Sequence, residues 1–405
     1  MTLNREDKIL IDLLREDNEP EILSTLERLT ASDWDGVIRR SFEHSVPSLL
    51  YRHLKTLWAH VPVPADIQGR LRQIYIDTAG ENIRLYHELS KVLGIFRNNG
   101  IPVIVLKGAH LGEIVYGNIG LRTLSDVDLL LKKEDLARGQ KSLMKAGCYL
   151  KSGKLMLDLH WNIDLSISDF NIDIEQVWKR AQPGVIAGTE VLVLSPEYLL
   201  LNICLHLSSV HLFQFNGLRA LCDIREMVNK YSDQIAWQKV KELAGQWGAI
   251  KAVYLVLLLA KDFLGARIPD EIIMNMRPAE FELRVRAWAV DQIFNERENR
   301  PVLSQKFWQL LRSHSFREQV SLLRKLLLPS PAFISQKYPG VFRSAKSYLY
   351  YPVRLQQRSM PFIKTLWGML TRNEGTVQFA KTEFRNAEMR EWLFRRGKCE
   401  FGRGK

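Results

Sequence analysis

Cysteine is scarce in this chain, which has four in 405 residues, and no pair has the CxxC spacing of zinc or redox sites. They are Cys148, Cys204, Cys222 and Cys399. Such scattered positions argue against a structural zinc site and against a disulfide framework.

Long apolar runs are missing as well. The longest, Ala252–Ala260, ends at Lys261-Asp262 and is far shorter than the roughly 20 residues that cross a bilayer. The first residues, MTLNREDKILIDLLRE, mix acids and bases and lack the apolar core of a signal peptide. We therefore expect a cytoplasmic protein.

Composition is otherwise ordinary, with 46% hydrophobic and 25% charged residues, and this length predicts two or three globular domains. The net charge of +12 is concentrated at the end of the chain. Pro331–Lys405 has fifteen Lys or Arg against five Glu, a net of +10. We expect a solvated basic helical face there, able to touch an anionic surface. No RNA-binding motif is present, and nucleic acid is not expected as a specific substrate.

Helical periodicity dominates the first hundred residues. Amphipathic patterns predict helices over 5–15, 34–43, 46–58 and 66–98. The last of these is expected to end at Asn98-Asn99-Gly100. Three apolar runs then predict buried strands at Ile101–Leu106, Val127–Leu131 and Leu155–Ile163, and a hairpin follows at Val185–Leu194.

The order of these elements predicts an α+β protein. A small mixed sheet is expected to lie between N-terminal helices and a mainly helical C-terminal half. We predict a helical region at 1–100, an α/β core at 101–194, a helical domain at 195–300 and a basic helical region at 301–405.

Acidic residues accompany two of the predicted strands. Asp126 and Asp128 are two apart, so they share one face of a strand, and Asp158 has a similar apolar setting. Neighbouring carboxylates repel each other unless a cation lies between them, which favours a divalent metal site. In the alternative interpretation Asp126 caps a turn after Ser125, while Asp128 pairs with Arg122.

Several motifs together resemble a bacterial nucleotidyltransferase family often described as uncharacterised. That family is similar to a divergent branch of the DNA polymerase β superfamily. The resemblance covers roughly the first 230 residues and rests on Leu106-Lys107-Gly108, Tyr116, Leu121-Arg122, Ser125–Leu130 and Asp158-Leu159-His160-Trp161.

The resemblance implies a nucleotidyltransferase core that uses two Mg²⁺ ions and an NTP. Asp126, Asp128 and Asp158 match the family's catalytic, metal-binding carboxylates. Gly108 would let the backbone approach the triphosphate, and Lys107 or Arg122 would add positive charge. The implied acceptor is a hydroxyl of an unidentified small molecule, sugar or peptide.

Three histidines remain ambiguous or structural in this interpretation. His160 shares a strand face with Asp158, so it either touches metal, base or phosphate or is a satisfied core residue. His206 and His211 are five apart on a predicted helix, a poor ligand spacing, and we expect them to pack or cap. Asp223 is expected to be a hydrogen-bond partner.

Two other functional classes stay open. A non-catalytic module on the same fold would bind a nucleotide or a partner, and a metal-dependent phospho- or glycosyltransferase would use the same acidic site.

Ala109 replaces the serine or glycine that usually follows the motif glycine, which removes one phosphate donor.

Overall fold

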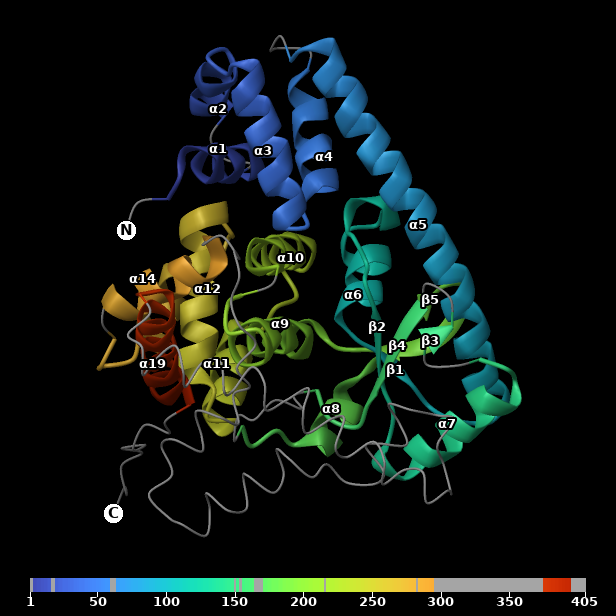
Figure 1. Ribbon diagram of the computed structural model, residues 1–405. Helices are drawn as coiled ribbons and strands as arrows, with labels where there is room; N and C mark the ends of the chain where they lie inside the picture. The colour runs from blue at the N-terminus through green and yellow to red at the C-terminus, as the bar shows by residue number, and fades with distance from the viewer. Residues whose placement is uncertain are drawn as a thin grey trace, which may run out of the picture. The chain divides into compact units, whose positions relative to one another are not determined.

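The computed structural model describes most of the chain as far as Phe294 and one helix beyond it (Figure 1). The described residues are 3–15, 19–58, 63–148, 151–152, 155–163, 170–214, 216–281, 283–294 and 374–394. The chain divides into two compact units, Met1–Asn295 with Trp392–Lys405, and Glu296–Glu391.

Much of the basic helical region predicted at 301–405 lies outside the described residues. Within it the structure describes helix α19 (Glu374–Phe394). The four-part division of the chain at 100, 194 and 300 therefore stays a prediction.

Helices occupy the N-terminal region as predicted. They are α1 (Arg5–Leu14), α2 (Glu19–Leu26), α3 (Ala31–Glu43), α4 (Pro47–Leu57) and α5 (Ala65–Asn98). The C-terminal half of α5 runs along the sheet (Figure 1), and its Leu89, Val92 and Phe96 belong to the buried core cluster there. This helix connects the N-terminal bundle to the sheet.

The described residues form one six-stranded mixed sheet in the order β3-β4-β2-β1-β6-β5. The strands are β1 (Ile104–Val105), β2 (Val127–Leu130), β3 (Lys151–Ser152), β4 (Leu155–His160), β5 (Gln182–Ile186) and β6 (Thr189–Val193). β2 runs parallel to β4 and antiparallel to β1, while β1 runs parallel to β6. This arrangement confirms the α+β class.

Strand ends differ from the sequence prediction: β2 stops at Leu130, one residue early, and the hairpin extends from Gln182 to Val193. The strand expected over Ile101–Leu106 pairs only at β1, and the strand expected to reach Ile163 stops at His160. The predicted hairpin is present as β5 and β6, with positive φ at both turn residues, Ala187 (51°) and Gly188 (68°). A two-residue turn with positive φ at both positions suits a tight hairpin.

Short helices follow the strands. They are α6 (Lys107–His110), a π-turn η1 (Leu111–Val115), the 3₁₀ turns η2 (Ile119–Leu121) and η3 (Lys133–Asp135), α7 (Leu136–Lys145) and α8 (Ile174–Arg180). Helix α6, which follows β1 in the chain, contacts β2. The Lys107-Gly108 turn therefore lies beside the start of β2.

The second half of the same unit is helical, as predicted. Its elements are α9 (Pro196–Leu205), a π-turn η4 (His206–Val210), α10 (Gly217–Lys230), α11 (Trp237–Gln246), α12 (Ile250–Leu264), α13 (Asp270–Met276) and α14 (Leu283–Phe294). The longest apolar run of the sequence lies in α12, which is buried among its neighbours. In the described part of the chain, no helix combines the length and apolar character that a bilayer crossing requires.

Candidate active site

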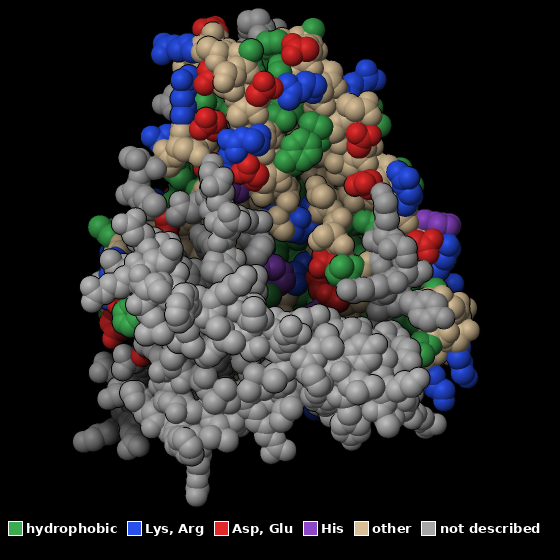
Figure 2. Space-filling view, in the orientation of Figure 1, with side chains coloured by type: hydrophobic (Ala, Val, Ile, Leu, Met, Phe, Trp, Pro, Cys, Tyr) green, Lys and Arg blue, Asp and Glu red, His purple; other side chains and the backbone are tan. Residues whose placement is uncertain are grey.

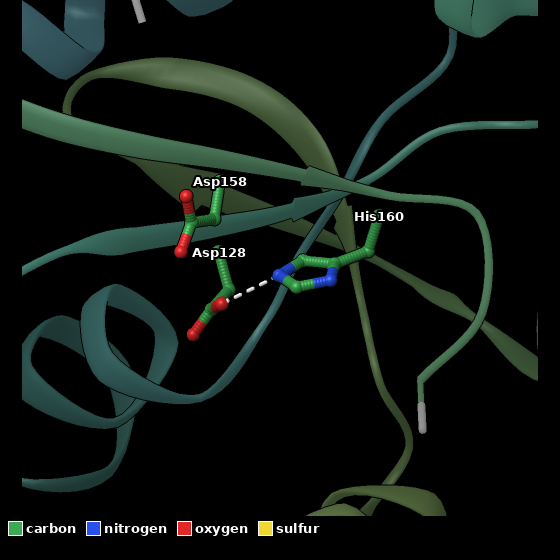
Figure 3. Close-up of side chains that lie close together, drawn as sticks. All are labelled: Asp128, Asp158 and His160. Atoms are coloured by element: carbon green, nitrogen blue, oxygen red, sulfur yellow. Dashed lines mark hydrogen bonds and ion pairs between the residues drawn. The ribbon is translucent and has the colours of Figure 1, made fainter. Parts of the chain in front are cut away.

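Strand register brings Asp128 and Asp158 together. In the parallel pairing of β2 with β4, Asp128 lies directly opposite Asp158, and Leu130 lies opposite His160. Side chains two apart share a face, so His160 joins the same side as Asp158 (Figure 3). Ligand atoms of Asp128, Asp158 and His160 all lie within 4.8 Å of one another.

Two cationic or polar groups hold the Asp128 carboxylate. The His160 Nε2 atom lies 2.6 Å from its Oδ1, and Lys107 donates from Nζ to its Oδ2 at 3.2 Å. Burial raises the pKa of Asp128, but the His160 hydrogen bond and the Lys107 charge outweigh it and leave the pKa below its usual range. Asp128 is therefore ionised at neutral pH.

Asp158 has the opposite electrostatic environment. Burial raises the pKa of its carboxyl group, and the neighbouring charges of Asp128 and Asp126 raise it further. Two carboxylates on adjacent strands repel each other in this way when no cation separates them. A divalent cation between the two carboxylates would relieve this repulsion.

Asp126 stands just before β2 and is not part of this three-residue cluster. Its Oδ1 accepts a hydrogen bond from the Ser125 hydroxyl at 2.9 Å. Asp126 and Asp128 nevertheless line the same cavity, and the charge of Asp126 reaches Asp158.

Arg122 pairs with Asp223 rather than with Asp128. Its Nε and Nη2 donate to the two carboxylate oxygens of Asp223 at 2.9 and 2.8 Å, and Tyr116 donates its hydroxyl to Asp223 at 2.9 Å. The alternative in which Arg122 neutralises Asp128 is therefore wrong. The expectation that Asp223 is a hydrogen-bond partner is confirmed.

Lys107 occupies a strained position at the end of β1. Its φ of 25° lies in the left-handed region, which a side chain other than glycine seldom adopts. The ammonium group bridges Asp128 and the imidazole of His206, whose Nδ1 lies 2.9 Å away. The strained backbone thus carries a side chain that links the sheet to the helical half.

A cavity lies between the start of strand β2 and the helices α9 and α10. Figure 2 shows acidic, basic and histidine side chains gathered around a hollow near the middle of the face in view. The polar residues that line the cavity are Lys107, Arg122, Ser125, Asp126, Asp128, His206, His211, Asn216, Arg219 and Asp223.

The two helical histidines line this cavity, although the sequence predicted packing or capping roles for them. Between them the chain forms the π-turn η4, in which the His211 amide donates to the His206 carbonyl at 3.1 Å. The wider turn brings the two rings into edge-on contact, with centroids 4.3 Å apart. Residues five apart on an α-helix are not neighbours, so the helical periodicity of the sequence did not predict contact between these two histidines.

Both imidazoles are neutral at physiological pH. Burial and the nearby Lys107 charge lower the pKa of His206 well below its usual value and that of His211 to about 4. Arg219, also missed in the sequence, reaches the cavity from α10. No local motif marks it, because the fold alone brings α10 to the sheet.

The model of the uncharacterised nucleotidyltransferase family matches residues 30–265, which is more than half of the chain. The chain belongs to this family. No curated protein and no solved structure matches it.

The matched range of this nucleotidyltransferase extends from the start of α3 to the end of α12. It contains the sheet, the carboxylate cluster and every residue that lines the cavity. Membership of this family indicates nucleotidyl transfer in general terms. The strands that contain the carboxylate cluster lie within the matched residues.

Proposed function

We propose that the protein transfers a nucleoside monophosphate from an NTP to a hydroxyl group of an acceptor, with two Mg²⁺ ions at its carboxylates. We place it in a divergent, bacterial branch of the DNA polymerase β-like superfamily. The observation that carries this proposal is the β2–β4 register, which sets Asp158 beside Asp128, a residue that lines the cavity.

The donor set fits magnesium. Asp128 and Asp158 present hard carboxylate oxygens from two rigid strands, and the Asp126 carboxylate lies on the same cavity. Desolvation first, and then the charge of Asp128, raise the pKa of Asp158, and a divalent ion would relieve the repulsion between the two carboxylates. Two bound ions would activate the attacking hydroxyl and stabilise charge on the leaving pyrophosphate.

The chain's own residues prepare this site. His160 and Lys107 each hold one oxygen of Asp128, so the carboxylate is oriented and ionised before any ligand binds. If a bound cation took up the carboxylate charge, Lys107 would be available to the phosphates of the nucleotide. His160 stays close enough to contact either metal or nucleotide.

Arg122 can serve the phosphates without leaving Asp223. Only Nε and Nη2 bond to Asp223, and Nη1 lies against Gly108: a Cβ placed on that glycine would be 3.1 Å from it. We assign Nη1, together with the backbone at Gly108, to the triphosphate. Ala109 is buried and supplies no hydroxyl there.

The decisive test replaces Asp128 with Asn, which keeps the shape and removes the charge. We expect Asp128→Asn, and separately Asp126→Asn, to lower Mg²⁺-dependent pyrophosphate release from NTPs in a cell extract about a hundredfold or more. Asp233→Asn, an exposed position, is the matched control. Thermal unfolding curves would establish that all variants fold.

The outcome separates this proposal from its alternatives. Full activity in both aspartate variants would overturn the carboxylate assignment. A wild-type protein that binds Mg-NTP in calorimetry yet releases no pyrophosphate with any extract would be a non-catalytic nucleotide-binding module. Release of inorganic phosphate or of a nucleoside diphosphate instead of pyrophosphate would indicate phospho- or glycosyl transfer.

A further inference from the structure

Most charged side chains that line the cavity form ion pairs with each other, and two do not. Lys107 neutralises Asp128, and Arg122 neutralises Asp223. Asp126 remains on the side of the sheet, where the proposed metal would bind. Arg219 remains on the side of α10, and the metal site gives it no role.

Arg219 is a partly buried cation on the wall of this cavity. Its Nη1 donates to the Thr123 carbonyl at 3.2 Å, and no ion pair joins it to any acid in the described part of the chain. Burial and the like charge of Arg122 lower the pKa of Arg219 to about 10, although the charges of Asp223 and Asp126 act in the opposite direction, so it remains charged at pH 7. A desolvated guanidinium of this kind gains most from an anionic ligand.

The groups around Arg219 suit an anion as well. His211 lines the same cavity and, as a neutral imidazole, can donate one N–H. Helix α10 begins at Gly217, after Asn216 with a left-handed φ of 61°, and the Asn216 side chain does not cap its first amides. Asn216 also lines the cavity, so the positive end of the helix dipole adds to the Arg219 charge.

We propose that Arg219 and His211 form a phosphate-binding subsite on the α10 wall of the cavity, separate from the Lys107-Gly108 turn. Its ligand is a phosphate group of a substrate, contributed either by the end of the NTP triphosphate or by a phosphorylated acceptor. The assignment of this phosphate to a substrate rests on the proposed function; the binding site itself does not.

The test measures binding in the absence of metal and turnover. Calorimetry of the full chain with sodium tripolyphosphate, in the presence of EDTA, reports the cationic subsite without the metal. We expect Arg219→Gln to bind tripolyphosphate about ten- to hundredfold more weakly than the wild type, because a charge-assisted contact is lost. His211→Gln is expected to show a smaller loss.

Lys230→Gln is the matched control, since it removes one positive charge from the exposed far end of the same helix. It should bind tripolyphosphate as the wild type does. Equal affinity of wild type and Arg219→Gln would overturn the subsite, as would no binding by a folded wild type. Neither result depends on pyrophosphate release, so failure here is distinct from failure of the proposed transfer reaction.

Competition then identifies the source of the phosphate. If ATP displaces tripolyphosphate from the wild type, and Arg219→Gln weakens both, the subsite belongs to the NTP. If inorganic phosphate still binds to the ATP-saturated protein, and Arg219→Gln abolishes that second event, it belongs to a phosphorylated acceptor. If Arg219→Gln changes neither affinity, the proposal is wrong.

Discussion

Gly108 shows how a single residue shapes the candidate site. A Cβ at this position would lie 3.0 Å from a Leu124 methyl group and 3.1 Å from the Nη1 atom of Arg122. Its φ is not in the left-handed region that favours glycine; the strained residue is its neighbour Lys107. Glycine is therefore needed here because the Leu124 and Arg122 side chains occupy the space that a Cβ would take, and the close approach of phosphates to this residue stays a prediction.

We predict that Gly108→Ala lowers both stability and NTP affinity. The added methyl group pushes Leu124 and Arg122 outward, and overpacking of this kind costs about 1 kcal/mol or more. Gly94→Ala in α5 is the control, because nothing lies within 4 Å of its Cβ position. There we expect stabilisation by up to about 1 kcal/mol. Urea unfolding and calorimetry with Mg-NTP would check both, and unchanged NTP affinity in Gly108→Ala would contradict the prediction.

At the scale of elements, two π-turns set the geometry of the cavity. η1 continues α6, and η4 continues α9. In η4 the hydroxyls of Ser208 and Ser209 donate to the carbonyls of Cys204 and Leu205 at 2.7 and 2.6 Å. Hydroxyls that bond backward to the preceding turn are compatible with its widened geometry. π-turns inside helices occur often at functional sites, and here one presents His206 and His211 together.

α6 also contains a histidine that makes the fold sensitive to acid. His110 is fully buried, and neither ring nitrogen has a hydrogen-bond partner among the described residues. Burial lowers the pKa of His110 to about 4, against about 6.5 in an unfolded chain. Between these values the unfolded state binds the extra proton, so stability falls as pH decreases from about 6.5 towards 4.

We predict that His110→Leu reduces this acid sensitivity. Acidification from pH 7.5 to 5.5 should cost the wild type about 1.4 kcal/mol more than the variant, measured by urea unfolding at each pH. His87→Leu, at an exposed position of α5, should retain the wild-type pH dependence. An identical loss in wild type and His110→Leu would show that His110 is not buried as a neutral group.

At the scale of the whole compact unit, a buried ion pair joins its first and last described helical parts. Arg40 of α3 donates two hydrogen bonds of 2.7 Å to Asp7 of α1 and one of 2.8 Å to the carbonyl of Phe294 at the end of α14. Both charged side chains are almost fully buried. Removal of the Asp7 charge would leave the buried Arg40 with the more exposed Glu43 as an acidic partner, and so with weaker compensation.

We predict that Asp7→Asn destabilises the unit by about 3 kcal/mol or more. Asp35→Asn is the control, because its ion pair with Arg70 is exposed and should contribute less than about 1 kcal/mol. Burial raises the pKa of Asp7, but His44 and Arg40 outweigh it and lower the pKa overall. This contribution is therefore present above about pH 3.8 and lost at lower pH. Urea unfolding at pH 7 compares the variants, and equal midpoints would contradict the assignment.

The sequence by itself determined the features that depend on local backbone geometry. Helical periodicity located the N-terminal and C-terminal helices, and apolar runs located β2, β4 and the hairpin. Because side chains on a strand alternate, it also placed Asp158 and His160 on one face. Strand ends were less accurate, since pairing with neighbouring strands decides where a strand stops.

Only the tertiary structure decided how residues far apart in the chain meet. The register of β2 with β4 set Asp128 beside Asp158, and the docking of α10 gave Arg122 to Asp223, 101 residues away. The sequence pattern of one segment does not indicate which distant residue will pair with a charged side chain in that segment. The same applies to Arg219 and to the histidines of η4, which reach the carboxylate site only because the helical half packs against the sheet.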